Sequence, residues 1–375
     1  MLLGGLEMKK TLLFGTILAA CIALGAISAT GADTVRFWYH FDDADNPMSD
    51  LVNAFEAANP DIKIEAENIP WGSYYDTLYT AIAAGSGPDT AMVKMFAQPR
   101  LIEMGALEPI DDRISNWSGK ADIQDNLFNI TKGPDGKSYY MPVQYVALYL
   151  YYRADLFAAA GLNPPATCDD FRAAAKALTK DGTYGFGFRG GKGGHDHWAS
   201  LVLSTGANFK PGGMTSDSAI AATQFVVDLF QKDKVFPPSA PNDGFKEIIG
   251  AFKAGKTAMT IHHIGSSNGM VEALGDKVSA TTVPECGGGR WTAFGDESTA
   301  IFSAVKSKDA AWKWISFLSS AENNAMFNKA TGQLPVTKSD SATWSLHEKR
   351  FVDATINSLP FANLLPNVSE TSDFV

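Results

Sequence analysis

The sequence predicts an α/β protein with two lobes, each a mainly parallel sheet flanked by helices, and a ligand cleft between the lobes. Segments with strand and helix patterns alternate along the chain, which is typical of parallel sheets whose strands are joined by helical crossovers. The length of 375 residues indicates two domains. The run at 145–152 is apolar on both alternating faces, as expected of a strand that is covered on both sides.

The first unit has the order strand, helix, strand, helix, strand. Apolar residues recur every three or four positions in both helical segments, and they alternate with charged residues in the second strand. Ser49 and Ser73 are candidate caps of the two helices. The expected elements are a strand at 34–39, a helix at 49–58, a strand at 62–66, a helix at 73–82 and a strand at 90–93.

A second unit follows the apolar run, whose tyrosines we expect to be mostly core. Gly161 can stop a short helix after this run, and Pro164-Pro165 prevents that helix from continuing. The further expected elements are helices at 169–178, 218–230, 245–252 and 310–320, and strands at 184–188, 257–261 and 298–305.

Polar and aromatic residues gather beside the predicted strand ends. Because sheets of this class bind ligands at the carboxyl ends of their strands, these residues are the candidates for a binding site. Flat rings suit the C–H face of a sugar, and carboxylates and imidazoles suit its hydroxyl groups. The candidate ligand-binding residues are His40, Phe41, Asp42, Trp71, Lys94, Phe96, His197, Trp198, His262, His263, Trp291, Asp296 and Glu297.

The N-terminal segment 8–32 has the pattern of a secretory signal peptide. Two lysines precede an almost unbroken apolar stretch, and small residues then cluster around Ala29 and Ala32, where we expect cleavage. A retained membrane anchor is the alternative, but the apolar run is short for a full span. Cys21 ends the string LAAC, which has the form of a lipoprotein box, although the residues after it stay apolar. We expect secretion to the periplasm and leave lipidation at Cys21 open.

Charge and cysteine content restrict the partners and cofactors. Lys and Arg number 31 and Asp and Glu 41, a net charge of −10, which argues against a nucleic-acid partner. Cys168 and Cys286 leave open either one long-range disulfide or two buried thiols. The histidines at 195, 197 and 262–263 lack the spacing of a metal site. We therefore expect no metal and no cofactor.

The chain carries little that points to a hydrolytic enzyme. The pattern H-E-x-x-H is absent from the sequence, and G-x-S-x-G occurs once, as GSSNG at 265–269, where no helix is predicted to follow as the turn of a nucleophilic serine requires. Asp296 and Glu297 are a conceivable glycosidase pair, but adjacent residues of an extended segment point to opposite faces. The glycine loop at 190–194 lacks the ending of a phosphate-binding loop, although Arg189 and Lys192 keep a phosphorylated polyol open as ligand. We expect a binding protein and no enzyme.

Several strings between Thr34 and Val336 occur in a characteristic order. They are FWYHF, AAGSGPD, LYYRADLFAAAGLNPP, GKTAMT and TGQLPV. In this order they resemble the extracellular solute-binding proteins of ABC importers, and most closely the type that binds maltose, oligosaccharides or glycerol-3-phosphate. The resemblance implies a periplasmic-binding-protein fold with lobes joined by hinge strands, a carbohydrate ligand, membrane-embedded permease subunits as partners, and a monomer.

The resemblance also implies where the chain passes between the lobes. The expected crossings are at 142–146, 283–289 and 319–322. The N-terminal lobe would comprise 33–143 and 286–319, and the C-terminal lobe 144–285 and 320–375. Gln144 and Tyr145 lie at the first crossing, so we expect both to contact the ligand.

The chain departs from the family pattern at three places. Cys168 stands where the family usually has Trp, and the loop after 257–261 carries His262 and His263 where a stacking aromatic residue is common. We therefore expect sugar stacking at Trp198 or Trp291. Family members usually continue past the equivalent of Val375, which suggests a truncated C-terminal end. The alternatives to a sugar ligand are a polyol phosphate, a metal ion or, in a different class, hydrolysis of a carbohydrate.

Overall fold

The computed structural model describes residues 32–41, 46–124, 126–340 and 343–375. The predicted signal peptide, apart from Ala32, lies outside these residues, as do Cys21 and Asp42. Among the described helices, none is long and apolar enough to cross a membrane.

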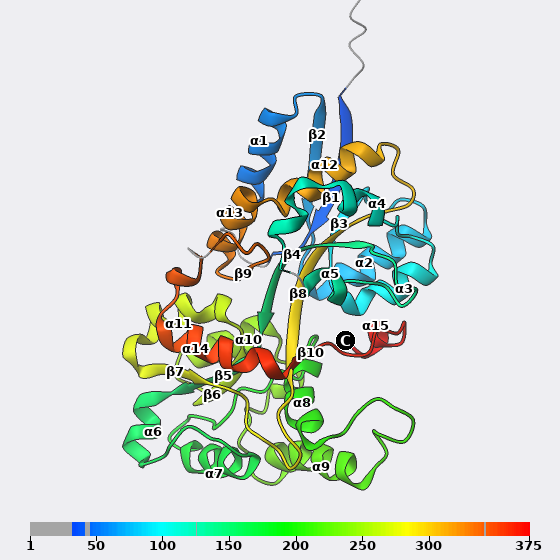
Figure 1. Ribbon diagram of the computed structural model, residues 1–375. Coiled ribbons are helices and arrows are strands. Elements are labelled where there is room, and N and C mark those ends of the chain that lie inside the picture. Colours follow the sequence, from blue (N-terminus) through cyan, green and yellow to red (C-terminus); the bar gives the residue numbers. More distant parts are fainter. Residues whose placement is uncertain (1–31, 42–45, 125, 341–342) are drawn as a thin grey trace, which may run out of the picture. The chain divides into compact units, whose positions relative to one another are not determined.

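Strands and helices alternate through the described chain (Figure 1). The strands are β1 (Asp33–Tyr39), β2 (Ile62–Asn68), β3 (Thr90–Val93), β4 (Tyr140–Ala147), β5 (Tyr149–Arg153), β6 (Met259–His262), β7 (Val278–Thr281), β8 (Thr292–Ile301), β9 (Leu334–Pro335) and β10 (Ala362–Asn363). The helices are α1 (Met48–Ala58), α2 (Trp71–Ala83), α3 (Gln98–Glu103), α4 (Asp111–Asn116), α5 (Leu127–Ile130), α6 (Ala154–Ala160), α7 (Cys168–Leu178), α8 (His195–Val202), α9 (Asp217–Gln231), α10 (Phe245–Lys253), α11 (Ser267–Leu274), α12 (Lys308–Leu318), α13 (Ala321–Thr331), α14 (Lys349–Ser358) and α15 (Thr371–Phe374).

The first sheet has the strand order β2-β1-β3-β8-β4-β9, with β10 beside β8. The pairs β1–β2 and β1–β3 are parallel, as predicted for the first unit. The pairs β3–β8, β4–β8 and β4–β9 are antiparallel. The prediction of a mainly parallel sheet therefore holds for β2-β1-β3 and for the short pair β10–β8, but not for these three antiparallel pairs, because β4 leaves this sheet toward the second one and β8 returns in the opposite direction (Figure 1).

The second sheet has the order β6-β5-β7, and both of its pairs are antiparallel. The strand predicted at 184–188 does not form, and this segment makes only isolated parallel bridges from Tyr184 to Thr257 and from Gly187 to Thr260. Its glycines explain the difference. A Cβ on Gly185 would lie 2.2 Å from the carbonyl oxygen of Ala175, so the backbone approaches α7 too closely for a regular, side-chain-bearing strand.

Helices cover both faces of the first sheet. One core contains residues from α1, α12 and the face of β1 that carries Val35 and Phe37, and another contains residues from α2, α3 and the opposite face of the sheet. A third core surrounds the second sheet. Tyr149 and Tyr151 are fully buried there, and their hydroxyl groups lie 2.7 Å apart. The tyrosine run is thus core at these two positions, as the sequence predicted.

Prolines set the starts of the first two helices. Pro47 precedes α1 and Pro70 precedes α2, and neither makes a side-chain cap hydrogen bond. The predicted caps Ser49 and Ser73 are wrong, since both residues lie inside the helices. Proline has its φ fixed near the helical value, so a helix can begin directly after it without a hydroxyl cap.

The return of the chain to the first sheet differs from the expected crossing at 283–289. Cys286 forms a disulfide with Cys168 at the start of α7, with their Cα atoms 5.1 Å apart. The segment 283–289 therefore lies beside α7, and the strand that pairs with both β3 and β4 is β8. The first expected crossing, at 142–146, falls within β4.

Candidate functional site

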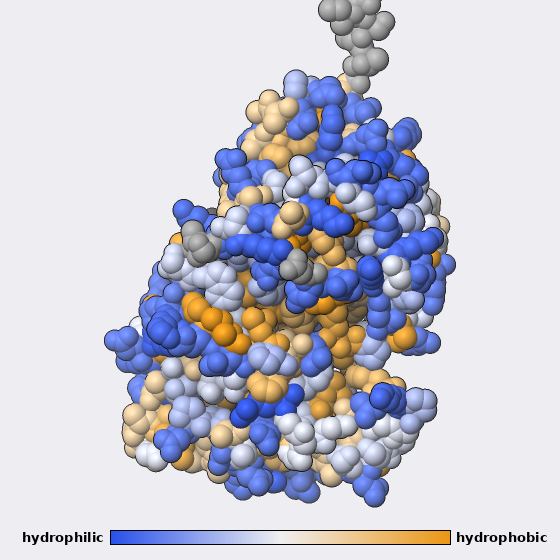
Figure 2. All heavy atoms as spheres, in the orientation of Figure 1, coloured by the Kyte–Doolittle hydropathy of each residue, from blue (hydrophilic) through white to orange (hydrophobic). Residues whose placement is uncertain are grey.

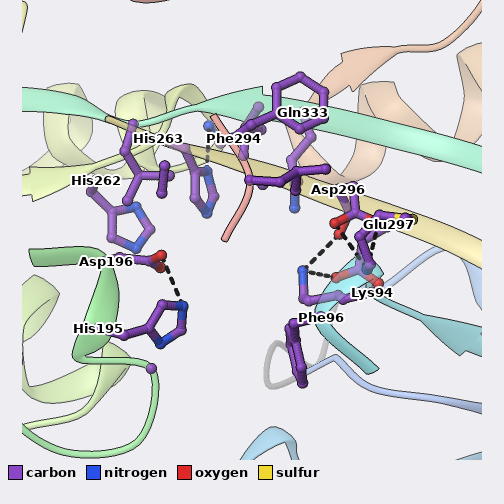
Figure 3. A pocket seen from close by; sticks show the side chains of 18 of the residues that line it. Lys94, Phe96, His195, Asp196, His262, His263, Phe294, Asp296, Glu297 and Gln333 are labelled. Carbon is purple, nitrogen blue, oxygen red and sulfur yellow. Dashed lines mark hydrogen bonds and ion pairs between the residues drawn. The ribbon is translucent and has the colours of Figure 1, made fainter. Parts of the chain in front are cut away.

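A cavity of about 320 Å³ is lined by residues from both sheets and from the C-terminal segment. Figure 2 shows apolar side chains gathered in the hollow between the upper and lower parts of the view. In Figure 3, Lys94, Phe96, Asp296 and Glu297 face the histidines of the opposite wall. The structure thus brings together strand-end residues that are up to about 250 positions apart in the sequence.

One wall of this cleft is a buried charged cluster of four residues. Lys94, directly after β3, forms an ion pair with Glu297 of β8, and its Nζ donates a hydrogen bond of 3.0 Å to the carbonyl oxygen of Asp296. His40, directly after β1, places Nε2 at 3.2 Å from the second carboxylate oxygen of Glu297. The backbone N–H of Met95 donates to the carboxylate of Asp296 at 3.0 Å. The cluster thus connects β1, β3 and β8 at the cleft.

Asp296 and Glu297 differ in their acidity. Burial is the main cause that raises the pKa of Asp296 to about 7; Lys94 acts against this rise, and the neighbouring Glu297 adds to it. Burial also raises the pKa of Glu297, but the charges of His40 and Lys94 outweigh it and hold that pKa below its usual value. Asp296 can therefore be protonated near neutral pH, while Glu297 stays ionised.

The raised pKa of Asp296 predicts that the free energy of unfolding falls as the pH rises from about 4 to about 7. Its folded-state pKa of about 7 exceeds the ordinary value of 3.8, so its contribution is full below pH 3.8 and is lost as the pH passes 7. A shift of about three units corresponds to at most about 4 kcal/mol. Asp296→Asn should therefore flatten the pH dependence of the free energy of unfolding, measured by urea denaturation. An unchanged slope would contradict the raised pKa.

The opposite wall carries histidines that are neutral at physiological pH. Burial lowers the pKa of His197 and of His263 to about 3, and it lowers that of His262 well below the ordinary value. His197 accepts a hydrogen bond of 3.0 Å from the backbone N–H of Arg189 at Nδ1 and lies 2.8 Å from the Ile261 carbonyl oxygen at Nε2. Neutral imidazoles of fixed orientation suit the recognition of uncharged hydroxyl groups.

His195 and Asp196 extend this wall. His195 Nε2 lies 3.0 Å from Asp196 Oδ1. Burial raises the pKa of Asp196, but the charges of His195 and Arg189 outweigh it and lower that pKa to about 2. Within the described ranges, no group of three or more His, Cys, Asp or Glu side chains is arranged to hold a metal ion.

Aromatic rings supply the flat surfaces of the cleft. The ring centroids of Trp71 and Phe96 lie 6.3 Å apart with their planes near perpendicular, and Lys94 Nζ lies 5.3 Å from the Trp71 ring. Trp291 and Phe294 line the cleft from the start of β8. Rings on several sides of one cavity can enclose the C–H faces of a sugar or polyol.

Most of the predicted site residues line this cleft. They are His40, Phe41, Trp71, Lys94, Phe96, Gln144, His197, His262, His263, Trp291, Asp296 and Glu297. Asp296 and Glu297 both face it, so the expectation that adjacent residues point apart is wrong here. The register of β4 against β8 shifts between Pro142 and Gln144, opposite Ser298 and Glu297, so β4 carries the extra residue of a bulge beside the two carboxylates, and a bulge increases the local twist of a strand pair.

Two predicted residues do not line the cavity. Tyr145 turns away from it, where its hydroxyl group bonds to the side chain of Gln124 at 3.0 Å and its ring stacks on Phe294 at 5.8 Å. Trp198 lies on α8, packs against the core of the second sheet and contacts Phe374 with ring centroids 5.4 Å apart. β4 is buried along its whole length, and Trp198 lies within α8, so position near a strand end did not suffice to place either side chain in the cavity.

Several lining residues were not predicted. They are Arg189, His195, Asp196, Phe245, Phe294, Gln333, Asn363 and Asn367, among others. Arg189, His195 and Asp196 follow the predicted strand at 184–188, so the strand-end rule pointed at them. Asn363 reaches the cleft because β10 pairs with the start of β8, through Ala362 with Thr292 and Asn363 with Ala293. No local sequence pattern predicts such a two-residue strand.

The family model of the bacterial extracellular solute-binding proteins matches residues 41–325. The chain belongs to this family. The resemblance inferred from the sequence is therefore confirmed. Among the relatives of this solute-binding protein, a binding protein of Brucella abortus strain 2308 is 29% identical over 339 residues, which cover 87% of this chain and 82% of the relative. The mannitol-binding protein of Pseudomonas aeruginosa is 26% identical and covers 70% of this chain and 62% of its own.

Solved structures confirm the two-lobed fold of the solute-binding protein. A solute-binding protein of Agrobacterium radiobacter K84 in complex with ribitol has a TM-score of 0.81 at 20% identity, covering 92% of this chain and 91% of its own. One from Thermotoga lettingae TMO, bound with α-D-tagatose, has a TM-score of 0.79 at 23% identity and covers 91% of each chain. At these identities the likeness establishes the fold.

Proposed function

We propose that this solute-binding protein captures a carbohydrate between its lobes and delivers it to the membrane-embedded permease subunits of an ABC importer. The observation that supports this most strongly is the composition of the cleft. Trp71, Phe96 and Trp291 offer ring faces, and His197 and His263 offer neutral hydrogen-bonding groups. A polyhydroxy compound without net charge fits both kinds of group.

The size of the cavity supports a small ligand. Its volume of about 320 Å³ is near the lower end of the range of roughly 300–1,000 Å³ for small-molecule sites. Proteins of the same fold are bound with tagatose, mannitol and ribitol, but also with maltose, maltotriose, acarbose and cycloalternan, so the cavity volume alone supports a small ligand. We therefore expect one or two sugar units or a sugar alcohol, in preference to a long oligosaccharide.

The alternatives are weaker but testable. A glycerol-3-phosphate-binding protein of Agrobacterium fabrum is 25% identical over 358 residues, so a polyol phosphate stays a candidate, with Arg189 and Lys94 on the cleft walls. The charge of Lys94 is matched by Glu297, which disfavours a dianion beside it. A hydrolase would use Asp296 and Glu297, but hydrogen bonds and ion pairs within the wall engage both carboxylates.

Location and lobe boundaries belong to the same proposal. We infer a periplasmic monomer whose signal peptide is 8–32, with lipidation at Cys21 as the alternative. The predicted lobes, 33–143 with 286–319 and 144–285 with 320–375, need one revision. The disulfide holds 286 beside α7, which favours a return crossing within β8, after residue 291.

A thermal-shift screen of the chain from residue 33 onward tests this function. The compounds are maltose, D-tagatose, D-mannitol, ribitol, glycerol-3-phosphate and divalent metal ions, each with calorimetry on any hit. A compound at a hundred times its dissociation constant stabilises by about 2.7 kcal/mol, so a carbohydrate or polyol hit should raise the melting temperature by a few degrees. Response to the phosphate or a metal alone, or release of a hydrolysis product, would overturn the proposal.

A further inference from the structure

The loop that carries Trp291 into the cleft contains three consecutive glycines. Gly287, Gly288 and Gly289 separate Cys286 from Arg290, and Gly287 and Gly289 have positive φ angles of 60° and 145°. Such a run has unusual conformational freedom because no side chain restricts the backbone. The position of the Trp291 ring therefore depends on contacts that anchor the chain before and after the three glycines.

The fixed point on the β8 side is Ser204. The backbone N–H of Trp291 donates to Ser204 Oγ at 2.8 Å, and the same hydroxyl group lies 3.3 Å from the Trp291 carbonyl oxygen. Ser204 Oγ also donates to the Ser200 carbonyl oxygen at 2.7 Å, so it belongs to the helical segment at α8.

The fixed point on the other side is the start of α7. The N–H of Cys168 donates to the Glu285 carbonyl oxygen at 2.9 Å, and the N–H of Glu285 donates to the Ala166 carbonyl oxygen at 2.8 Å. The disulfide between Cys168 and Cys286 joins the same two segments covalently, directly before the first glycine. Cys286 is 3% exposed and Cys168 is half-buried, so the crosslink lies at the edge of the core of this lobe.

The start of α7 is itself rigid. Thr167 accepts a hydrogen bond from the N–H of Asp170, and Asp170 accepts one from the N–H of Thr167, which completes a capping box. The disulfide therefore connects the glycine run to a helix end that is fixed independently of it.

We propose that the Cys168–Cys286 disulfide is a positioning element of the binding site, which holds the glycine run so that Trp291 stays at the cleft wall. The inference rests on the proposed function, because it assigns Trp291 to the bound carbohydrate. Cysteine pairing makes the affinity of this cleft sensitive to reduction, although neither sulfur lines the cavity. Such a crosslink is stable in the oxidising compartment that the predicted secretion implies.

A double-mutant cycle separates positioning from general stabilisation. The wild type, Cys168→Ala/Cys286→Ala, Trp291→Ala and the triple variant are compared for affinity toward whichever of maltose, D-mannitol and D-tagatose binds the wild type. We expect removal of the disulfide to weaken binding about five- to tenfold, and to have no further effect once Trp291 is absent. An equal loss of affinity in the Trp291→Ala background, or no loss in the wild-type background, would overturn the proposal.

Ser216→Ala is the matched control. It removes the cap of α9 in the same lobe and lowers the melting temperature, but it leaves the disulfide and the start of α7 in place. The affinity should stay within about twofold of that of the wild type. A loss as large as that of the cysteine variant would mean that lower stability of the lobe alone weakens binding, and it would overturn the proposal.

Amide hydrogen exchange tests, in the absence of any sugar, whether the disulfide restrains the backbone at Trp291. Exchange at the Trp291 and Gly289 amides should rise at least tenfold when the disulfide is removed, while that of β5 stays unchanged. Unchanged exchange at Trp291 overturns the positioning role. If none of the three sugars binds the wild type, the proposed function fails, and the exchange result still stands or falls by itself.

Discussion

Lys94→Met is expected to lower the free energy of unfolding by about 3 kcal/mol. Glu297 is 5% exposed and would lose the lysine of its ion pair, and removing one partner of a buried ion pair leaves an uncompensated charge. The value is placed at the low end of the known range because the side chain of Lys94 is 24% exposed to the cleft. Urea denaturation at pH 7 measures the change.

The double variant Lys94→Met/Glu297→Gln is the control for this prediction. It removes both charges and should recover part of the lost stability, because a buried neutral amide costs far less than a buried unpaired carboxylate. If the double variant is less stable than Lys94→Met alone, the ion pair is not what stabilises this wall.

Trp291→Ala and Trp198→Ala are expected to have opposite effects. Trp291 lines the cleft and is half-buried against the core of the second sheet, so its loss should weaken carbohydrate binding by about 1–3 kcal/mol, or roughly 5- to 150-fold, with a smaller change in ligand-free melting than Trp198→Ala causes. Trp198 packs against the core and against Phe374, so its loss should destabilise the fold by about 3 kcal/mol.

Paired measurements distinguish the two tryptophans. Calorimetric affinity and melting without sugar are recorded for each variant in the same buffer. A lower melting temperature with unchanged affinity for Trp291→Ala would remove it from the binding site. A cleft role for Trp198 would show as weaker binding of a protein that melts like the wild type.

The sequence predicted the elements better than their pairing. The periods of 2 and 3.6 located most of the long helices and strands, because burial of one face dictates them, but the helices α13 and α14 were not predicted and the strand at 184–188 does not form. The relative direction of paired strands was predicted wrongly where the chain crosses between the sheets. Whether β8 pairs with β3 in parallel or antiparallel depends on how the chain connects the two sheets, which periodicity does not show. The caps were missed because Pro47 and Pro70 start the helices without a hydroxyl group.

The site was predictable where it follows strand ends and unpredictable elsewhere. His40, Lys94 and Glu297 meet because three strands end at or cross one edge of a sheet. Tyr145 was misplaced because its register with Asp296 follows an irregularity at Pro142 and Gln144 that no residue pattern reveals. Asn363 was missed because a long-range pairing brings it to the cleft.

The pairing of β4 with β8 has a consequence for the order in which a sugar would contact the cleft residues. Asp296 and Glu297 lie on this ladder, paired with Tyr145 and Gln144, whereas Phe96 and His262 project from the separate walls. When the walls rotate about the ladder, atoms near this pivot move least and atoms at the rims move most. If the proposed function holds, we expect a sugar that enters an open form to meet the carboxyl groups first, at nearly their final positions. The rings and histidines would make contact later, so the carboxyl groups would set the orientation of the bound sugar and the rims its rate of release.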